Sequence, residues 1–417
     1  MTHRTRLATL ATLLLLASAA RAQTRAFTGA TLLDGTDRAP VPNATLLVRD
    51  GRVVAAGPAG RVPIPTGAER VSLAGKTVIP GLVNAHGHVK DSTRDLRTYA
   101  AYGVTTVFSL GDEPPEVFAA RAAQRTPPAS SGAGSLERAR VFLAGPVLAP
   151  KSPEEARSLV ARDESLHVDV VKIRVDDNLG TTPKMPPEIY RAVIDEAHRR
   201  GMRVATHLYY LADAKALLDA GSDFVAHSIR DADVDAGVIA KLKARGVCVS
   251  PTLMREVSTF VYESTPDFFG DPSFIAHANP EWVAQLSKPE AQQAVRASAS
   301  AQRYKTALVV ASRNLKTLVD AGVPIAMGTD TGPTGRFPGY FELMELEYMV
   351  KAGLTPRQAL QAATRDAARC MHIDAEVGTL EPGKWADFVA LDADPLADIS
   401  NVRRISSVWI AGNRVAR

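Results

Sequence analysis

Cysteine is scarce in this sequence, with two residues among 417. The pair, Cys248 and Cys370, is too small a set for the disulfide framework that holds small secreted domains together. We therefore predict two buried free thiols, because an unpaired cysteine behaves as a small apolar side chain. The fold is not expected to depend on disulfide bonds.

Long apolar runs are also missing, apart from one at residues 7–20. Two arginines precede this run, and the small-residue site Ala-Arg-Ala follows it. The run is shorter than the ~20 residues that span a bilayer, so we interpret residues 1–22 as a cleaved secretory signal peptide. An uncleaved membrane anchor is the alternative. The mature protein is expected to be exported, periplasmic or secreted, with no membrane partner after cleavage.

A strong charge of one sign is absent as well. The formal charge is +4, and residues 1–22 carry three arginines and no acidic residue, so their removal leaves +1 (4 − 3). This balance does not favour a nucleic acid or an anionic membrane as partner. The sequence shows no repeat period, and it does not indicate an oligomeric state.

Both ends of the mature chain show the pattern of short β-strands joined by turns. Residues 23–77 contain ATLLVRDGRVVAAG, in which Asp50-Gly51 is a strong hairpin signal. The pattern returns in residues 376–417 as ADFVALDAD and SVWIAGNRV, with Gly412-Asn413 at another turn. We predict that the two ends together build one composite β-sandwich.

Residues 78–375 alternate apolar runs with helical segments. Helical segments such as EIYRAVIDEAHRRG and ADAKALLDAG each close with a glycine. Eight units of this kind fit an α/β fold of the (β/α)8 TIM-barrel type. A doubly wound open sheet is the alternative, although the sequence has no GxGxxG or P-loop motif to accompany it. The eight candidate strands lie near Val78, Val104, Val141, Val168, Val204, Phe224, Val247 and Val323.

Four histidines occupy the ends of these candidate strands. His86 and His88 are two residues apart, so on a strand both side chains point to the same side and can hold one ion. His207 and His227 end consecutive strands, which places them side by side on the rim of a barrel. A lone strand histidine is more often a core residue, but this combination favours a metal site.

Two further residues fit the same site. Asp330 follows the apolar run that ends in Gly-Thr, and it can hold a metal ion and act as the general base, although an N-cap role is the alternative. Lys172 lies in the apolar strand VDVVKI, where an unpaired ammonium is costly to bury. Such a lysine can react with carbon dioxide to give a bridging carbamate. The alternative is a lysine that reaches the rim or pairs with Asp169.

These motifs resemble the amidohydrolase superfamily, in the branch of imidazolonepropionases and zinc-dependent prolidase-like and carboxypeptidase-like enzymes. The resemblance covers TVIPGLVNAHGH, the KI of VDVVKI, ATHL, VAHS, GTD and LEPGKWADFVALDADPL. It implies a (β/α)8 barrel with a composite β-sandwich and two divalent ions, zinc by default, with manganese, cobalt or iron possible. By this resemblance the first ion is held by His86, His88 and Asp330, the second by His207 and His227, and carboxylated Lys172 bridges the two. Imidazolonepropionases in the strict sense look mononuclear and have no lysine at the bridging position, so Lys172 favours the binuclear, peptidase-like side of this branch.

The functional hypothesis is an exported metal-dependent hydrolase that cleaves an amide C–N bond in a dipeptide or an N-acyl amino acid. A hydroxide bridging the ions would attack the carbonyl carbon, and Asp330 would pass the proton to the leaving nitrogen. Tyr209 is a candidate oxyanion donor, and Arg174 and Arg230 are candidate partners of a substrate carboxylate. The alternatives are a mononuclear cyclic-amide hydrolase and a binding protein with an inactive barrel.

Two interruptions of the alternating pattern predict loops. Residues 126–135 are rich in Pro, Gly and Ser and indicate an inert surface loop. Residues 254–302 follow the seventh candidate strand and carry six aromatic residues. Aromatic side chains in a long loop above a barrel mouth suggest a lid, with a self-packed surface excursion as the alternative. The six are Phe260, Tyr262, Phe268, Phe269, Phe274 and Trp282.

Overall fold

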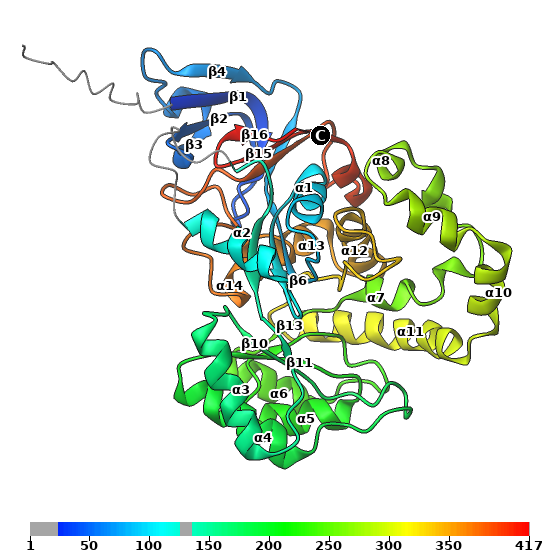
Figure 1. Ribbon diagram of the computed structural model, residues 1–417. Coiled ribbons are helices and arrows are strands. Elements are labelled where there is room, and N and C mark those ends of the chain that lie inside the picture. Colours follow the sequence, from blue (N-terminus) through cyan, green and yellow to red (C-terminus); the bar gives the residue numbers. More distant parts are fainter. Residues whose placement is uncertain (1–23, 126–135, 417) are drawn as a thin grey trace, which may run out of the picture.

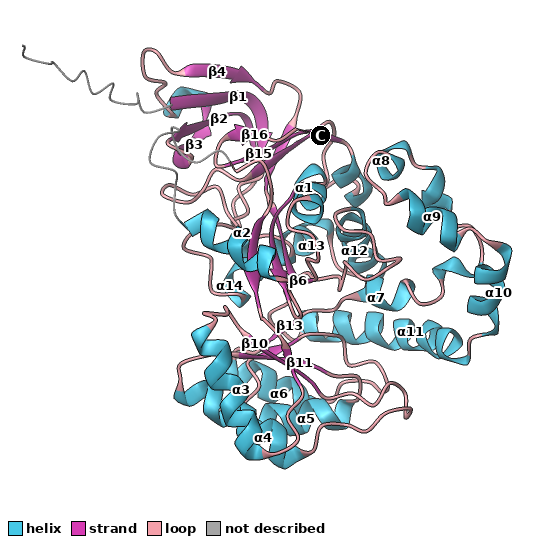
Figure 2. Ribbon diagram, in the orientation of Figure 1, coloured by secondary structure: helices cyan, strands magenta, loops and turns pink. Residues whose placement is uncertain are grey.

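The computed structural model describes residues 24–125 and 136–416 of the chain. The predicted signal peptide and the predicted loop at residues 126–135 lie outside the described residues. The fold is a mixed α/β arrangement in which a sheet at one end of the molecule adjoins a larger body of parallel strands and helices (Figures 1 and 2). Within the described residues, no helix has the length and apolar character required to cross a membrane.

Strands from both chain ends share one eight-stranded sheet. Its order is β16-β15-β14-β5-β1-β2-β3, and β4 pairs with β1. Asp50 and Gly51 form the predicted hairpin turn between β2 and β3, both with positive φ (52° and 77°), as a type I′ turn requires. The strands are β1 (Thr24–Leu32), β2 (Val41–Arg49), β3 (Arg52–Pro58), β4 (Glu69–Ser72), β5 (Thr77–Pro80), β14 (Phe388–Leu391), β15 (Ile405–Ile410) and β16 (Asn413–Arg414).

The remaining strands are parallel and short. They form a three-stranded sheet, β6-β7-β8, and a five-stranded sheet, β13-β12-β11-β10-β9. The eighth candidate strand is represented by isolated parallel bridges, in which Ile325 pairs with Val249 and Thr331 pairs with Gly87. The strands are β6 (Leu82–Gly87), β7 (Val104–Ser109), β8 (Arg140–Leu143), β9 (Val147–Leu148), β10 (Val171–Arg174), β11 (Val204–His207), β12 (Phe224–Val225) and β13 (Cys248–Val249).

The run that begins near Val78 is divided between two sheets, whereas the sequence analysis placed it in one strand. β5 pairs with β1 and β14, and β6 starts the parallel strands beside β7. The chain changes partner at Gly81, where a Cβ atom would lie 2.1 Å from Thr105 Oγ1. Only a residue without a side chain allows this close approach.

Helices follow most of the parallel strands and cover them from outside (Figure 1). The predicted helical segments at residues 188–201 and 212–221 correspond to α4 and α5, and Gly221 caps α5 with a φ of 107°. The longer helices are α1 (Arg94–Ala101), α2 (Pro115–Arg125), α3 (Pro153–Ser165), α4 (Pro187–Arg199), α5 (Leu211–Ala220), α6 (Ala236–Arg245), α10 (Pro289–Ala297), α11 (Ala299–Asp320) and α12 (Tyr340–Lys351). The shorter ones are α7 (Leu253–Val257), α8 (Pro272–Ile275), α9 (Pro280–Leu286), α13 (Pro356–Ala362) and α14 (Arg365–Cys370), with 3-10 turns at Ala59–Arg61, Val261–Glu263, Asp267–Gly270 and Ile399–Arg403.

The long segment at residues 254–302 forms an arm that begins in α7, next to α11 and α12, and continues through α8, α9 and α10 at the side of the molecule (Figure 1). Its aromatic rings pack mainly on one another and on the region around α12. The ring centroid of Phe274 lies 4.8 Å from that of Phe337 and 5.0 Å from that of Tyr340. Trp282 also contacts Phe337, with a centroid distance of 5.6 Å. This packing agrees with the self-packed alternative, and the lid stays a prediction.

The prediction of two free thiols is wrong, because Cys248 and Cys370 form a disulfide with a Cα–Cα distance of 5.8 Å. The bond joins the start of β13 to the end of α14, across 122 residues of sequence. Sequence spacing cannot reveal such a pair, since the fold alone brings two distant cysteines within bonding distance.

Candidate active site

Three of the predicted metal ligands form a compact cluster at the ends of β6 and of the segment after Ile325. One ligand atom from each of His86, His88 and Asp330 lies within 4.8 Å of the others. Asp330 Oδ1 lies 2.8 Å from His88 Nε2 and 3.6 Å from His86 Nε2. The α12 helix begins at Tyr340, so Asp330 is not the N-cap of a described helix. Two imidazoles and a carboxylate are a common ligand set for zinc and related ions.

The other two histidines lie against this cluster. The ring centroid of His227 is 4.6 Å from that of His86 and 4.2 Å from that of His207. Both rings belong to the ends of neighbouring parallel strands, β11 and β12. The structure therefore brings together all four histidines that the sequence analysis selected.

Each of the four rings has one nitrogen occupied by a protein partner. His86 Nδ1 lies 2.6 Å from the Ala226 carbonyl oxygen, and His88 Nδ1 lies 3.4 Å from the Gly111 carbonyl oxygen. His207 Nε2 lies 2.8 Å from Asp176 Oδ2, and His227 Nδ1 lies 2.7 Å from Thr252 Oγ1. Such partners fix the tautomer and direct the other ring nitrogen towards a metal.

His227 gives the clearest indication that the site holds a further group. Its Nε2 atom is buried and has no hydrogen-bond partner within the described part of the chain. A buried polar atom without a partner is costly, and a metal ion would satisfy it. The residues present therefore fit a divalent cation.

Lys172 lies beneath the histidines, on the strand β10. Its side chain is 3% exposed, and Nζ lies 3.4 Å from His86 Nε2. Burial lowers the pKa of Lys172 to about 7, against the opposing effect of Asp330. Asp169, the alternative partner considered for Lys172, forms an ion pair with Arg121 (2.6 Å). A buried lysine with a depressed pKa is nucleophilic.

The sequence analysis did not select Arg336, which contacts Asp330 directly. Arg336 Nη1 lies 2.5 Å from Asp330 Oδ2, and Arg336 Nε donates a hydrogen bond to Ser258 Oγ (3.1 Å). Burial alone would raise the pKa of Asp330, but Arg336 and His88 outweigh burial and hold it well below its usual value. The spacing of six residues between Asp330 and Arg336 does not predict their contact, because the conformation of the turn after Asp330 determines which side chains point back towards it.

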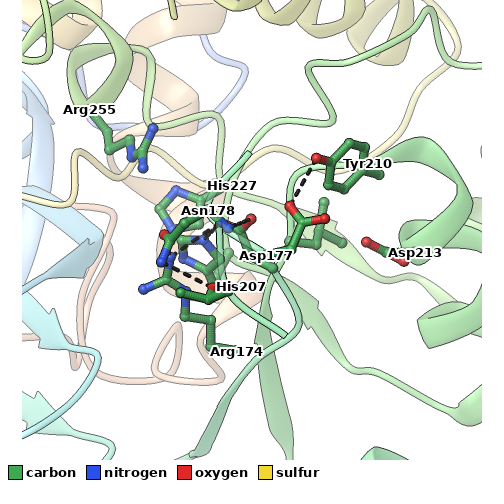
Figure 3. Close-up of polar contacts among 12 residues, drawn as sticks. Arg174, Asp177, Asn178, His207, Tyr210, Asp213, His227 and Arg255 are labelled. Carbon is green, nitrogen blue, oxygen red and sulfur yellow. Dashed lines mark hydrogen bonds and ion pairs between the residues drawn. The ribbon is translucent and has the colours of Figure 1, made fainter. Parts of the chain in front are cut away.

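The three predicted substrate-contact residues have different environments. Arg174 is exposed and donates a hydrogen bond to Asn178 beside His207 (Figure 3). Arg230 is 1% exposed and donates to the carbonyl oxygens of Leu208 (2.8 Å) and Ser228 (2.7 Å). Its guanidinium lies over the ring of Tyr209, which is itself buried. The predicted substrate contacts of all three remain predictions.

The sequence analysis did not select two further residues, Asp176 and Arg255. Asp176 is 5% exposed and holds His207. Its position just after the end of β10, two residues beyond Arg174, was an available signal. Arg255, drawn in Figure 3, is buried and forms an ion pair with Glu256 (3.1 Å). Its place could not be read from the sequence, since it belongs to the long arm.

The comparison with protein families decides the class of this protein. Residues 77–415 match the model of the amidohydrolase family. The chain belongs to the amidohydrolase family. The predicted resemblance to this family is therefore confirmed.

Individual relatives of this amidohydrolase are distant. It is 27% identical over 281 residues to the ochratoxinase of Aspergillus niger, and it spans about half of that protein (64% of this chain, 51% of the relative). It is 25% identical over 400 residues to the imidazolonepropionase of Cutibacterium acnes, covering 86% of each chain. Among solved structures, a protein from Bifidobacterium longum assigned as a prolidase has a TM-score of 0.76 and 27% identity, covering 95% of each chain.

Proposed function

We propose that this protein is an exported metal-dependent amidohydrolase that cleaves an amide C–N bond in a dipeptide or an N-acyl amino acid. The observation that carries the proposal is the convergence of four histidines, each with one nitrogen held by a protein partner, on Asp330 and the buried Lys172. The fold we propose is the (β/α)8 barrel with a composite β-sandwich, in which the parallel strand ends carry the site.

The metal set we propose is two divalent ions, zinc by default, with manganese, cobalt or iron as other occupants. His86, His88 and Asp330 would hold one ion, and His207 and His227 the other. Lys172, carboxylated on Nζ, would lie between them, in keeping with its burial. When bound, the ions would supply an activated water and polarise the scissile carbonyl group.

Asp330 is the residue that we propose for proton transfer. Its Oδ1 atom faces the histidines, and its Oδ2 atom is held by Arg336. Asp330 would accept the proton of the attacking water and deliver it to the leaving nitrogen, which completes cleavage of the C–N bond. Arg336 would fix the carboxylate in the orientation that this transfer needs.

Substrate recognition would use the arginines around the site. Arg230 Nε and Nη2 and Arg255 Nε are buried without hydrogen-bond partners in the described structure, although both side chains lie within ion-pair distance of Glu256. Because these guanidinium nitrogen atoms have no hydrogen-bond acceptor in the described structure, the two arginines are candidates for binding a substrate carboxylate. Arg174 at the rim is a further candidate, and Tyr209 is the candidate oxyanion donor.

Export is supported by the disulfide between Cys248 and Cys370. Disulfides persist in oxidising compartments such as the periplasm and are rare in the cytosol. The bond therefore agrees with a secretory signal in residues 1–22 and with a periplasmic or secreted location.

A mononuclear cyclic-amide hydrolase is the second candidate. The observation in its favour is the match to an imidazolonepropionase over 86% of both chains. In that case Lys172 would not hold metal. Ring opening of an imidazolone-type compound, in the absence of dipeptide hydrolysis, would favour this candidate.

The deciding experiment is the metal content per chain of the wild type and of Lys172→Ala, measured by mass spectrometry of protein purified without added metal. We expect about two ions in the wild type and one or none in the variant. A single ion that the substitution does not affect would contradict the binuclear proposal. Loss of amide hydrolysis in Asp330→Asn, with the metal content retained, would test the proton-transfer role separately.

A further inference from the structure

The helix α12 carries two carboxylates that the proposed chemistry does not use. Glu342 and Glu345 are both 0% exposed and lie three residues apart, so they point to the same side of the helix. Burying two acids on one helix face is costly unless each has firm hydrogen-bond donors. Their donors belong to the strand β6, to the turn of Asp330 and to the start of α7, which follows the hydrogen-bond partner of His227.

Glu342 accepts hydrogen bonds from both neighbours of Asp330. Its Oε1 atom lies 2.6 Å from Thr329 Oγ1 and 2.6 Å from Thr331 Oγ1. The same oxygen accepts a third hydrogen bond from Asn84 Nδ2 (2.6 Å). Asn84 Oδ1 in turn accepts from the backbone N–H of His86 (2.9 Å). One carboxylate oxygen therefore holds the strand of His86 and the turn of Asp330 together.

Glu345 holds the neighbouring turn in a similar way. Its two oxygens accept from the backbone N–H groups of Leu253 (2.8 Å) and Met254 (2.7 Å). The residue just before them, Thr252, is the hydrogen-bond partner of His227 Nδ1. Glu345 therefore fixes the turn that orients His227.

The two turns share a second feature, which is a strained backbone. Asp330 has a φ of 59° and Thr252 a φ of 47°, both in the left-handed region that non-glycine residues seldom adopt. For a β-branched residue such as Thr252 this conformation is especially unfavourable. Strained residues of this kind persist only when surrounding contacts determine their conformation. In this protein those contacts include Glu342 and Glu345.

We infer that α12 is the positioning helix of the metal site, in which Glu342 sets the backbone of Asp330 and Glu345 sets the turn that orients His227. The inference rests on the metal site of the proposed function. Neither glutamate would bind the ions or the substrate itself. Both act through residues that do, and removal of such partners typically costs 10- to 100-fold in metal affinity.

The two glutamates should respond differently to replacement by glutamine. Glu342 uses only Oε1, and its Oε2 atom has no partner in the described structure. Glutamine can therefore keep all three hydrogen bonds of Glu342. Glu345 uses both oxygens on backbone N–H groups, so glutamine would place an NH2 group against an N–H.

The test is zinc affinity, measured by competition with a chromophoric chelator on the metal-free full chain. We expect Glu345→Gln and Glu342→Leu to weaken zinc binding by about 10-fold or more, and Glu342→Gln to remain within about 3-fold of the wild type. The control is Glu347→Gln on the same helix, whose side chain pairs with Arg403 instead. It should bind zinc as the wild type does. The absorption spectrum of the cobalt-loaded protein should change in the first two variants only.

The outcomes distinguish failure of the proposed function from failure of the inference about α12. If the wild type binds no divalent metal, the proposed function fails. If the wild type binds metal, and Glu345→Gln and Glu342→Leu bind it equally well, the inference fails while the proposed function stands. Should Glu342→Leu not fold, the contrast between the two glutamine variants still decides, since equal affinities for both would overturn the inference.

Discussion

At the scale of single residues, the site depends on how each side chain is held. Asp330 is the clearest case, because His88 contacts one of its oxygens and Arg336 the other. A carboxylate fixed at both ends keeps one orientation, and a proton-transfer group benefits from being held in place before reaction. Arg336 would therefore contribute to the proposed proton transfer, although it is not one of the candidate metal ligands.

The first prediction concerns this arginine. A hydrogen bond to a charged partner contributes about 1.5–3 kcal/mol, so Arg336→Ala should lower kcat/KM for amide hydrolysis by roughly 10- to 100-fold. Arg336→Lys should recover part of the loss, because an ammonium can still reach the carboxylate. The measurement is steady-state kinetics on the dipeptide that the wild type cleaves best, with equal metal content in each variant. Wild-type kinetics in Arg336→Ala would exclude the positioning role.

A second prediction concerns Asp163 on α3, which is 0% exposed and whose carboxylate oxygens have no hydrogen-bond partner in the described structure. Burial raises the pKa of Asp163 to about 7. The folded protein therefore binds one more proton than the unfolded chain between about pH 4 and pH 7, and stability falls as pH rises through that window.

Asp163→Asn removes this titration. Its free energy of unfolding relative to the wild type should increase from pH 5 to pH 8, and the gain should level off above pH 7. Urea unfolding at several pH values measures the difference. An offset that is the same at every pH would show that Asp163 is ionised in the folded state.

At the scale of elements, the named helical segments and most of the predicted strand positions are found in the structure, but several of the parallel strands are very short. The segments predicted at residues 188–201 and 212–221 form α4 and α5 because their apolar spacing and their glycine caps are local signals. The strands β9, β12 and β13 are two residues long, and their pairing is set by neighbours distant in sequence. Local patterns cannot fix the register of such short strands.

The arm of residues 254–302 gives a prediction at this scale. Phe274 is 1% exposed and contacts the rings of Phe268, Phe337 and Tyr340. Phe274→Ala should destabilise the protein by about 3–5 kcal/mol, the usual cost of removing a buried aromatic ring. The adjacent Ile275 is 60% exposed, so Ile275→Ala is the matched control and should change stability little. Thermal unfolding compares the two. If Phe274→Ala unfolds at the wild-type temperature, the ring cluster does not stabilise the arm.

At the scale of the whole molecule, two long-range contacts join distant parts of the chain. Arg140 on β8 forms an ion pair with Asp387 (2.8 Å), just before β14, and so links the parallel strands to the sheet of the chain ends. The disulfide joins β13 to α14. The ion pair and the disulfide each join segments that are more than 100 residues apart in the sequence.

The disulfide supplies the last prediction. A bond that closes a loop of 122 residues restricts the unfolded chain, and such bonds typically stabilise by about 2–5 kcal/mol. The reduced protein, or the Cys248→Ser, Cys370→Ser double variant, should therefore unfold at a lower temperature and bind zinc with unchanged affinity. Calorimetry with and without reductant, together with zinc titration, checks both parts. Loss of zinc binding on reduction at moderate temperature would show that the bond also shapes the site.

The sequence by itself determined the family, and it allowed six candidate metal ligands to be selected, because each lies inside or at the end of a short apolar run. It also determined the hairpin at Asp50-Gly51, whose turn residues act locally. Only the tertiary structure decided the partners that hold the ligands: Asp176, Thr252, Arg336, Glu342 and Glu345. It likewise decided the Cys248–Cys370 bond and the change of sheet at Gly81. Many of these contacts join residues far apart in sequence, and their geometry is set by packing, which a sequence pattern of period two or 3.6 does not encode.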